Sequence, residues 1–419
     1  MELIAGGLSW YAALPAAVMV MIGIFLVGLL LARLRVLDAL RSAIYVAGAI
    51  VGMNAMVGMF ASAVVPELSG VVESLGLSLD VIDLGVGSSY ASVLFPLGFY
   101  SILLVVGLAV NVIMILTKLT DTFDVDVFNY SVWALASSYV WAITGNVVLA
   151  IVAFVINEVV VLKFADFTAP AIQKAYGLDG ISIPHGNAVI FAPIGIAVNW
   201  VIERIPVLAR IDWSPETIER RFGGMVQPST IGFVMGIVLG VVGRQDFGMT
   251  LLLGITVAAF MIVFPRVENV LVEGITPVAD GMREVCAKRF KRELNIGLDA
   301  AILIGMPDVM ATGILVTPVV LLLAFVLPGN RVLPMADLAI AAPFLVSCCM
   351  PYCKKNIFRG FIAGVVVMTI ALYMCSMTAD WYTAAAAMNG LPFESVSTTL
   401  GICSSWVAGA LGQLFSLFA

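Results

Sequence analysis

The stretch Gly180-Ile181-Ser182-Ile183-Pro184-His185-Gly186-Asn187 interrupts a chain that otherwise consists largely of apolar segments. His185 is the only histidine in 419 residues, and an apolar run that ends near Trp200 follows it. Glycine and proline beside a polar residue, at the start of an apolar segment, predict a broken helix or a re-entrant hairpin. Irregular backbone persists at membrane depth only where protein or a water-filled cavity satisfies it. In membrane transporters such breaks often form the substrate site. The alternative is a histidine in an ordinary outer loop.

The composition decides the class of protein. The chain is 62% hydrophobic and 11% charged, with a mean hydropathy of +1.09, whereas soluble domains carry about 25% charged residues. We therefore expect an all-α integral membrane protein. The length allows roughly ten or eleven segments of about 20 residues each.

Hydropathy and charge predict the following eleven membrane segments: about 11–32, 44–64, 92–116, 131–156, 188–202, 230–243, 248–265, 309–327, 336–349, 358–378 and 399–418. Basic residues gather after the first segment, in 203–228, in 266–292 and in 354–359. The positive-inside rule assigns these stretches to the cytoplasm. The predicted topology therefore places the N-terminus outside and the C-terminus in the cytoplasm.

A second interrupted stretch mirrors the first. In 295–308, apolar residues and glycines precede Pro307-Asp308, and an apolar segment follows directly. Pro184-His185 has the same setting earlier in the chain. Paired interruptions at corresponding places in two halves indicate a transport site. We expect one membrane-embedded domain over 1–419, with repeat one at about 1–202, a cytoplasmic loop at 203–229 and repeat two at about 230–419.

Ionisable side chains inside a membrane segment are costly and therefore indicate function. The candidates here are His185, Asp299 and Asp308. Together with Asn187 and the polar group Ser88, Ser89 and Tyr90, which precedes the segment at 92–116, they could bind a polyhydroxylated ligand through carboxylates, hydroxyls and imidazole nitrogens. Asp299, Ser88 and Ser89 could instead be helix N-caps.

Other function classes lack their motifs. The sequence has no phosphate-binding Gly-x-x-x-x-Gly-Lys pattern, no voltage-sensor arginine spacing and no nucleophilic triad. The spacing of Cys348, Cys349 and Cys353 fits no zinc pattern well. We expect no cofactor, no metal, no catalytic residue in this chain and no nucleic-acid partner.

Several motifs resemble the galactitol-type enzyme IIC permeases of the bacterial phosphotransferase system, which group with the ascorbate-type permeases. They are 180–186, Ile296-Gly-Leu-Asp-Ala300, Leu327-Pro-Gly-Asn-Arg-Val-Leu-Pro334, Asn111-Val, the 124–129 segment and 227–236. The resemblance runs along nearly the whole chain.

It implies a homodimer in the bacterial inner membrane, with a transport core, a dimerisation domain, inverted repeats and two re-entrant hairpins. It further implies translocation of a polyol or sugar by an elevator-like movement. A IIB protein that carries a phosphocysteine, supplied with phosphate by IIA, would phosphorylate the substrate, so this chain would hold no phosphate itself.

The sequence departs from that family at Met306, where galactitol-type relatives often have histidine. The region of Ser88–Tyr90 also looks shorter. Met306 removes a hydrogen-bonding group, so the resemblance implies a polyol or hexose substrate without specifying galactitol. The alternative function is an ion-coupled secondary sugar transporter that uses His185 and Asp308 as a proton relay.

Overall fold

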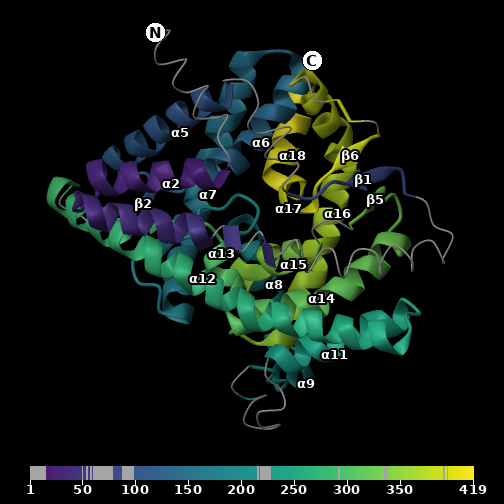
Figure 1. The fold of residues 1–419 in the computed structure, drawn as a ribbon. Helices are drawn as coiled ribbons and strands as arrows, with labels where there is room; N and C mark the ends of the chain where they lie inside the picture. The colour runs from purple at the N-terminus through teal and green to yellow at the C-terminus, as the bar shows by residue number, and fades with distance from the viewer. Residues whose placement is uncertain are drawn as a thin grey trace.

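The computed structural model describes residues 16–49, 51–52, 55–56, 59, 79–86, 99–214, 217, 228–290, 293–334, 338–389, 392–393 and 395–419. Within them the chain is mainly helical (Figure 1). The helices are α2 (Ala16–Leu26) with a π-helical end (Val27–Leu31), a helix at 36–49, α5 (Phe99–Leu116), α6 (Val127–Thr144), α7 (Val147–Tyr176), α8 (Ala192–Glu203), α9 (Pro206–Ala209), α11 (Pro228–Val242), α12 (Phe247–Phe290), α13 (Ala301–Ile304), α14 (Pro307–Val326), α15 (Leu338–Val346), α16 (Ile357–Met388), α17 (Leu400–Cys403) and α18 (Trp406–Phe415).

Three of these helices, α7, α14 and α16, are long and apolar enough to cross a membrane, and several shorter apolar helices accompany them. The prediction of a helical membrane protein is confirmed. The number of segments that cross the membrane stays a prediction.

Several helix boundaries differ from those expected. The segment expected at 131–156 is two helices, because Gly145 ends α6 in the left-handed conformation, with φ of 65°, and the Asn146 side chain accepts hydrogen bonds from the first N–H groups of α7. α7 then continues to Tyr176. Glycine after a helix and asparagine before one are ordinary stop and start signals, but the hydropathy runs through both.

At the C-terminal side, the segment expected at 399–418 is interrupted between α17 and α18 at Ser404-Ser405, where the Ser405 hydroxyl caps α18.

In the middle of the chain, the basic stretch 266–292, which was expected to follow the membrane segment at 248–265, lies largely in α12, a single helix of 44 residues. Charges do not end a helix, and the Glu284–Lys288 pair, four residues apart, supports it.

Two small parallel sheets, which the sequence analysis did not anticipate, connect distant parts of the chain. The first contains β1 (Val81–Asp83) between β5 (Val332–Leu333) and β6 (Ser397–Thr398). The second contains β4 (Asn295–Gly297) between β2 (Thr122–Asp124) and β3 (Ile181–Ser182). The central strand of each sheet and its two neighbours come from opposite halves of the chain.

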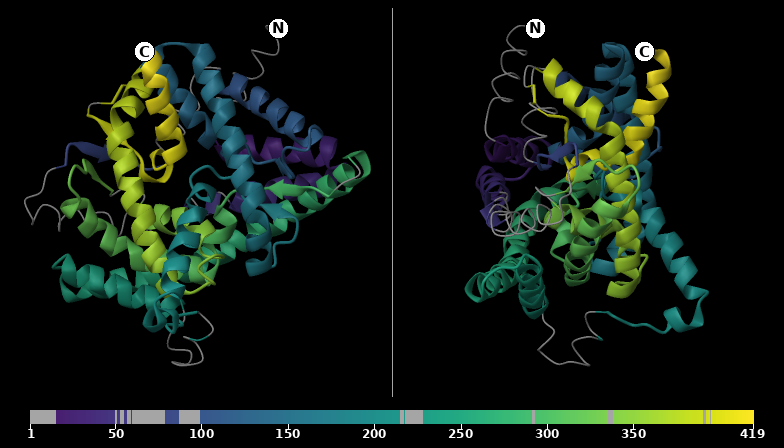
Figure 2. Two further views of the ribbon diagram at one scale, coloured as in Figure 1. Left: turned by 180° about the vertical axis from the view of Figure 1, so that it is seen from behind. Right: turned by 90° about the vertical axis from the view of Figure 1, so that its right-hand side faces the viewer.

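The core lies where the two halves meet. Among the largest fully buried side chains are Trp133 and Tyr139 of α6, Phe154 of α7 and Tyr382 of α16. Tyr139 donates a hydrogen bond of 3.1 Å to Thr378 of α16. Figure 2 shows the C-terminal helices, in yellow, beside α6 from behind and from the side, and α16 and α18 both pack on α6. This packing holds the segments around His185 in place.

Candidate functional site

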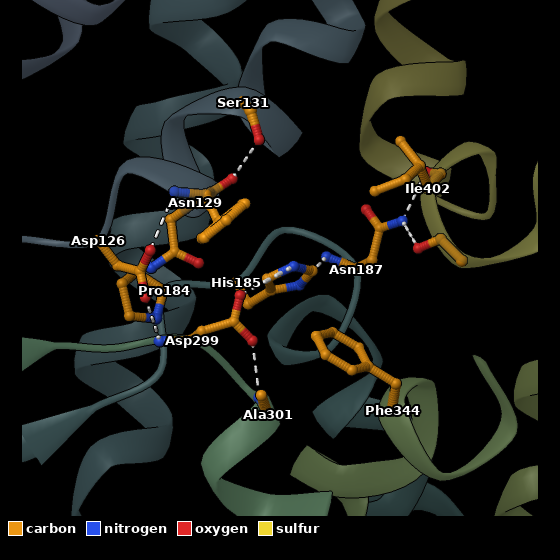
Figure 3. Close-up of polar contacts among 12 residues, drawn as sticks. Asp126, Asn129, Ser131, Pro184, His185, Asn187, Asp299, Ala301, Phe344 and Ile402 are labelled. Carbon is orange, nitrogen blue, oxygen red and sulfur yellow. Dashed lines mark hydrogen bonds and ion pairs between the residues drawn. The ribbon is translucent and has the colours of Figure 1, made fainter. Parts of the chain in front are cut away.

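Three loops converge because three parallel strands end at one edge of the second sheet. Asp126 follows β2, His185 follows β3 and Asp299 follows β4. The carboxyl ends of parallel strands lie together, and in open parallel sheets ligands bind outside those ends. Figure 3 shows the His185 ring and the Asp299 carboxylate facing each other, with Asp126 on the far side of Asp299.

The His185 ring is held in a defined orientation. Its exposed fraction is only 2%, and the Phe344 ring of α15 packs edge-on against it, with ring centroids 4.5 Å apart. The Asn187 N–H donates to Nδ1 at 3.3 Å. Nδ1 is therefore the acceptor nitrogen, and in the neutral ring Nε2 carries the hydrogen.

Asp299 uses its two carboxylate oxygens differently. Oδ1 accepts a 2.7 Å hydrogen bond from the Ala301 N–H at the start of α13, so the side chain does cap a helix. Oδ2 faces His185 Nε2 at 3.9 Å. This distance exceeds that of a hydrogen bond. The two groups therefore make no direct hydrogen bond, and a ligand hydroxyl that lies beside the pair could reach both atoms at about 2.8 Å.

Asp126 supports this arrangement from the loop after β2. Its segment, 124–129, was among the motifs of the resemblance, but Asp126 was not predicted as a site residue. Its Oδ1 accepts from the Phe128 N–H and caps α6, and its Oδ2 accepts from the Asp299 N–H at 3.2 Å. The strand-like run Thr122-Phe123-Asp124 followed by two more residues to Asp126 is the sequence signal that could have indicated it.

Burial controls the charges of these groups, which all lie outside the helices. Burial lowers the pKa of His185 to about 3, so the ring is neutral at physiological pH. Burial raises the pKa of Asp299, and burial together with the negative charge of Asp299 raises the pKa of Asp126. Because the ring is neutral and the two atoms are 3.9 Å apart, His185 and Asp299 do not form a salt bridge.

Asn187 connects the site to the C-terminal part of the chain. Its side chain is fully buried, and its Nδ2 donates to the carbonyls of Gly401, at 2.7 Å, and Ile402, with Ser404 Oγ at 3.2 Å. Asn187 was predicted from its position in the sequence, but its hydrogen-bond partners at the break between α17 and α18 were not. Its Oδ1 has no hydrogen-bond partner.

The Pro184-His185 turn is also fixed from behind by α6. Trp133 Nε1 donates to the Pro184 carbonyl at 3.0 Å, and Asn157 of α7 donates to the Trp133 carbonyl at 3.0 Å. A side chain at Gly186 would approach Val132 and Trp133 of α6 within 3.1 and 3.4 Å. The absence of a side chain there lets the turn lie directly on the helix.

Asp308 belongs to a separate contact. It is fully buried in the first turn of α14, and its Oδ2 accepts a 2.8 Å hydrogen bond from the Tyr176 hydroxyl at the end of α7. In the described part of the chain, no hydrogen bond or ion pair joins Asp308 to His185. The proposed residues Ser88, Ser89 and Tyr90 lie outside the described residues.

The convergent groups suit a neutral ligand rich in hydroxyls. His185 offers a donor, Asp299 Oδ2 offers an acceptor, Asn187 Oδ1 is a further acceptor without a partner, and Phe344 supplies an apolar ring. The described residues contain no group of three or more histidine, cysteine or acidic side chains placed to hold a metal ion.

Comparisons with known proteins identify the family of the chain. The family model described as "PTS system sugar-specific permease component" matches residues 14–397. The chain is 33% identical over 412 residues to an Escherichia coli (strain K12) protein named as a permease IIC component, covering 98% of this chain and 94% of that one. It is 32% identical over 355 residues to proteins named "PTS system galactitol-specific EIIC component" in Escherichia coli strains K12 and O157:H7, covering 84% of this chain and 78% of theirs. The chain therefore belongs to the family of sugar-specific permease components of the phosphotransferase system.

Proposed function

We propose that this chain is the IIC permease that carries a polyol or sugar of the galactitol type across the bacterial inner membrane for phosphorylation by a IIB protein. The observation that carries the proposal is the pairing of a donor, His185 Nε2, with an acceptor, Asp299 Oδ2, which face each other at 3.9 Å without a direct hydrogen bond where three loops meet. A ligand hydroxyl beside this pair accepts from the ring N–H and donates to the carboxylate, both at hydrogen-bond distance.

Asn187 and Asp126 complete the proposed site. Asn187 Oδ1 is a buried acceptor without a partner, and a buried polar atom of that kind calls for a donor. A substrate hydroxyl supplies one. Asp126 holds the Asp299 backbone in position, so we assign it a positioning role.

Asp308 remains a candidate for a second contact with the substrate along its path. Its Oδ1 is buried without a partner, although Tyr176 occupies the other oxygen. Ser88, Ser89 and Tyr90 remain candidates on the sequence pattern alone.

The strand pairing supports the proposed internal repeat. If β1, β2 and β3 correspond to β4, β5 and β6, the sheet order β5-β1-β6 becomes β2-β4-β3. Each half would thus supply the central strand of one sheet and both outer strands of the other. This exchange ties the halves together around the site, so that these parts of both halves could move as one rigid body in an elevator-like movement.

We propose further that the chain is a homodimer, with its N-terminus outside and its C-terminus in the cytoplasm. The exposed apolar side chains of the α11–α12 pair, such as Val234, Val241 and Ile255, suit lipid or a second copy. Cross-linking in native membranes and reporter fusions at the C-terminus test these two points.

The deciding experiment is uptake of a labelled polyol panel by cells that express this chain, with and without IIA and IIB. Group translocation predicts accumulation of the phosphate ester only when IIB is present. Accumulation of the free sugar, collapsing with the proton gradient, would instead establish the secondary transporter.

A binding experiment tests the site itself. In His185→Ala the purified protein loses one hydrogen bond to the substrate, and in Asp299→Asn it loses a charge-assisted one. Typical values of about 1 kcal/mol and about 1.5–3 kcal/mol predict affinities lower by roughly 5-fold and about 10- to 100-fold. Asn146→Ala, at an exposed helix cap, is the control. Unchanged affinity in both site variants refutes the assignment.

A further inference from the structure

Beside the candidate substrate site lies a cluster of buried oxygen atoms to which the proposed transport gives no role. It is formed by Asp124 at the end of β2, Asn129 in the first turn of α6 and Glu158 in α7. Their exposed fractions are 1%, 0% and 0%. Both oxygens of Glu158, Oδ2 of Asp124 and Oδ1 of Asn129 have no hydrogen-bond partner.

The helix geometry directs Glu158 toward this cluster. Residues three and four apart share one face of a helix, and Glu158 lies between Phe154 and Val161. Phe154 packs beside Tyr130 of α6 around Gly107, and Val161 packs against Gly186. Glu158, on the same face of α7 as these two residues, therefore faces α6 and the end of β2.

All the unsatisfied atoms are acceptors, and two belong to carboxyl groups. In the described residues no salt bridge reaches Asp124 or Glu158. The Asp124 side chain accepts hydrogen bonds from the Asn129 amide at 3.0 Å and from the Asp126 N–H at 3.1 Å, both at Oδ1. Two unpaired carboxylates in an apolar interior are strongly unfavourable. Oxygen-only donor sets of carboxylate and amide carbonyl are the ligands that hard cations prefer.

We propose that Glu158, Asp124 and Asn129 form a buried site for a hard metal cation. The cation draws the four free oxygens together and neutralises the carboxylates. Asp124 Oδ1 also accepts the Asp126 N–H at 3.1 Å, and Asp126 in turn holds Asp299. A bound cation therefore stiffens the β2 loop that supports the substrate site.

The test uses the purified full-length protein, freed of metals by a chelator, without any sugar. Its thermal unfolding is followed in NaCl, MgCl₂ and CaCl₂, each against choline chloride at the same ionic strength. We expect a saturable rise in the unfolding midpoint with at least one of these cations, because a ligand that binds the folded state stabilises it by mass action.

Glu158→Gln keeps the size of the side chain and removes its charge, so the saturable rise should be lost. Asp38→Asn, an exposed acidic residue paired with Arg35, should retain it. If Glu158→Gln does not fold, Asn129→Ala replaces it and should move the titration to higher cation concentrations.

Two results overturn the proposal. The first is a wild-type protein that no cation stabilises beyond choline, which means that protons neutralise the carboxyls. The second is a Glu158→Gln variant with an unchanged cation response. Both measurements are made without sugar and without transport, so this test and that of the transport function fail independently.

Discussion

The Asn187 side chain is the point at which the loop after β3 depends on the C-terminal helices. Asn187→Ala removes the two N–H groups that serve the carbonyls of Gly401 and Ile402. Each buried acceptor that loses its donor costs about 1–3 kcal/mol. For two acceptors we expect a loss of about 2–5 kcal/mol in the free energy of unfolding, the upper end being reduced by relaxation of the short helix α17.

Asn187→Asp separates hydrogen bonding from packing. It preserves the volume of the side chain but replaces the donor with an oxygen that faces two carbonyls. We expect it to destabilise the protein at least as much as Asn187→Ala, since it buries an uncompensated acceptor or charge. If packing alone mattered, Asn187→Asp would be tolerated.

The assay is reversible unfolding of the purified protein in mixed micelles with increasing SDS, followed by tryptophan fluorescence. Asn146→Ala is the matched control, because Asn146 caps α7 at an exposed position and a lost cap costs about 0.5–2 kcal/mol. A loss below about 1 kcal/mol in Asn187→Ala, or a stable Asn187→Asp, would refute the reasoning.

Three further predictions follow from the packing and burial of the site. Trp133→Phe removes the donor to the Pro184 carbonyl and should cost about 1–3 kcal/mol in the same assay; stability equal to wild type would contradict it. Gly297→Ala places a methyl group within 2.8 Å of neighbouring atoms and should reduce substrate binding, whereas Gly48→Ala, with nothing within 4 Å, should leave binding intact. Because the folded pKa of His185 is about 3 and the unfolded value is about 6.5, the unfolded state binds the extra proton between these values. His185 therefore lowers stability as pH falls from about 6.5 to about 3, and His185→Gln should flatten that part of the stability profile; an unchanged profile would show that the ring is not buried neutral.

The interruption at Pro184-His185 and the class of membrane protein were visible in the sequence, because both depend on local chemistry. A proline and glycines between apolar runs break a helix wherever they occur, and the apolar content leaves no soluble alternative. The second interruption was predicted for the same reason, and the structure places Asp299 at the loop after β4 and Asp308 at the start of α14. The resemblance to the IIC permeases, read from the same motifs, is confirmed by the family comparison.

The tertiary structure alone decided which of these residues meet. Strands of two or three residues give no hydropathy signal, yet the pairing of β2, β3 and β4 brings Asp126, His185 and Asp299 together across 173 positions of the chain. Asp308 pairs with Tyr176 instead, although its sequence setting looks like that of His185. Hydrogen bonding between parallel strands joins segments irrespective of their separation in the sequence, so local patterns identify the candidates while long-range pairing selects among them.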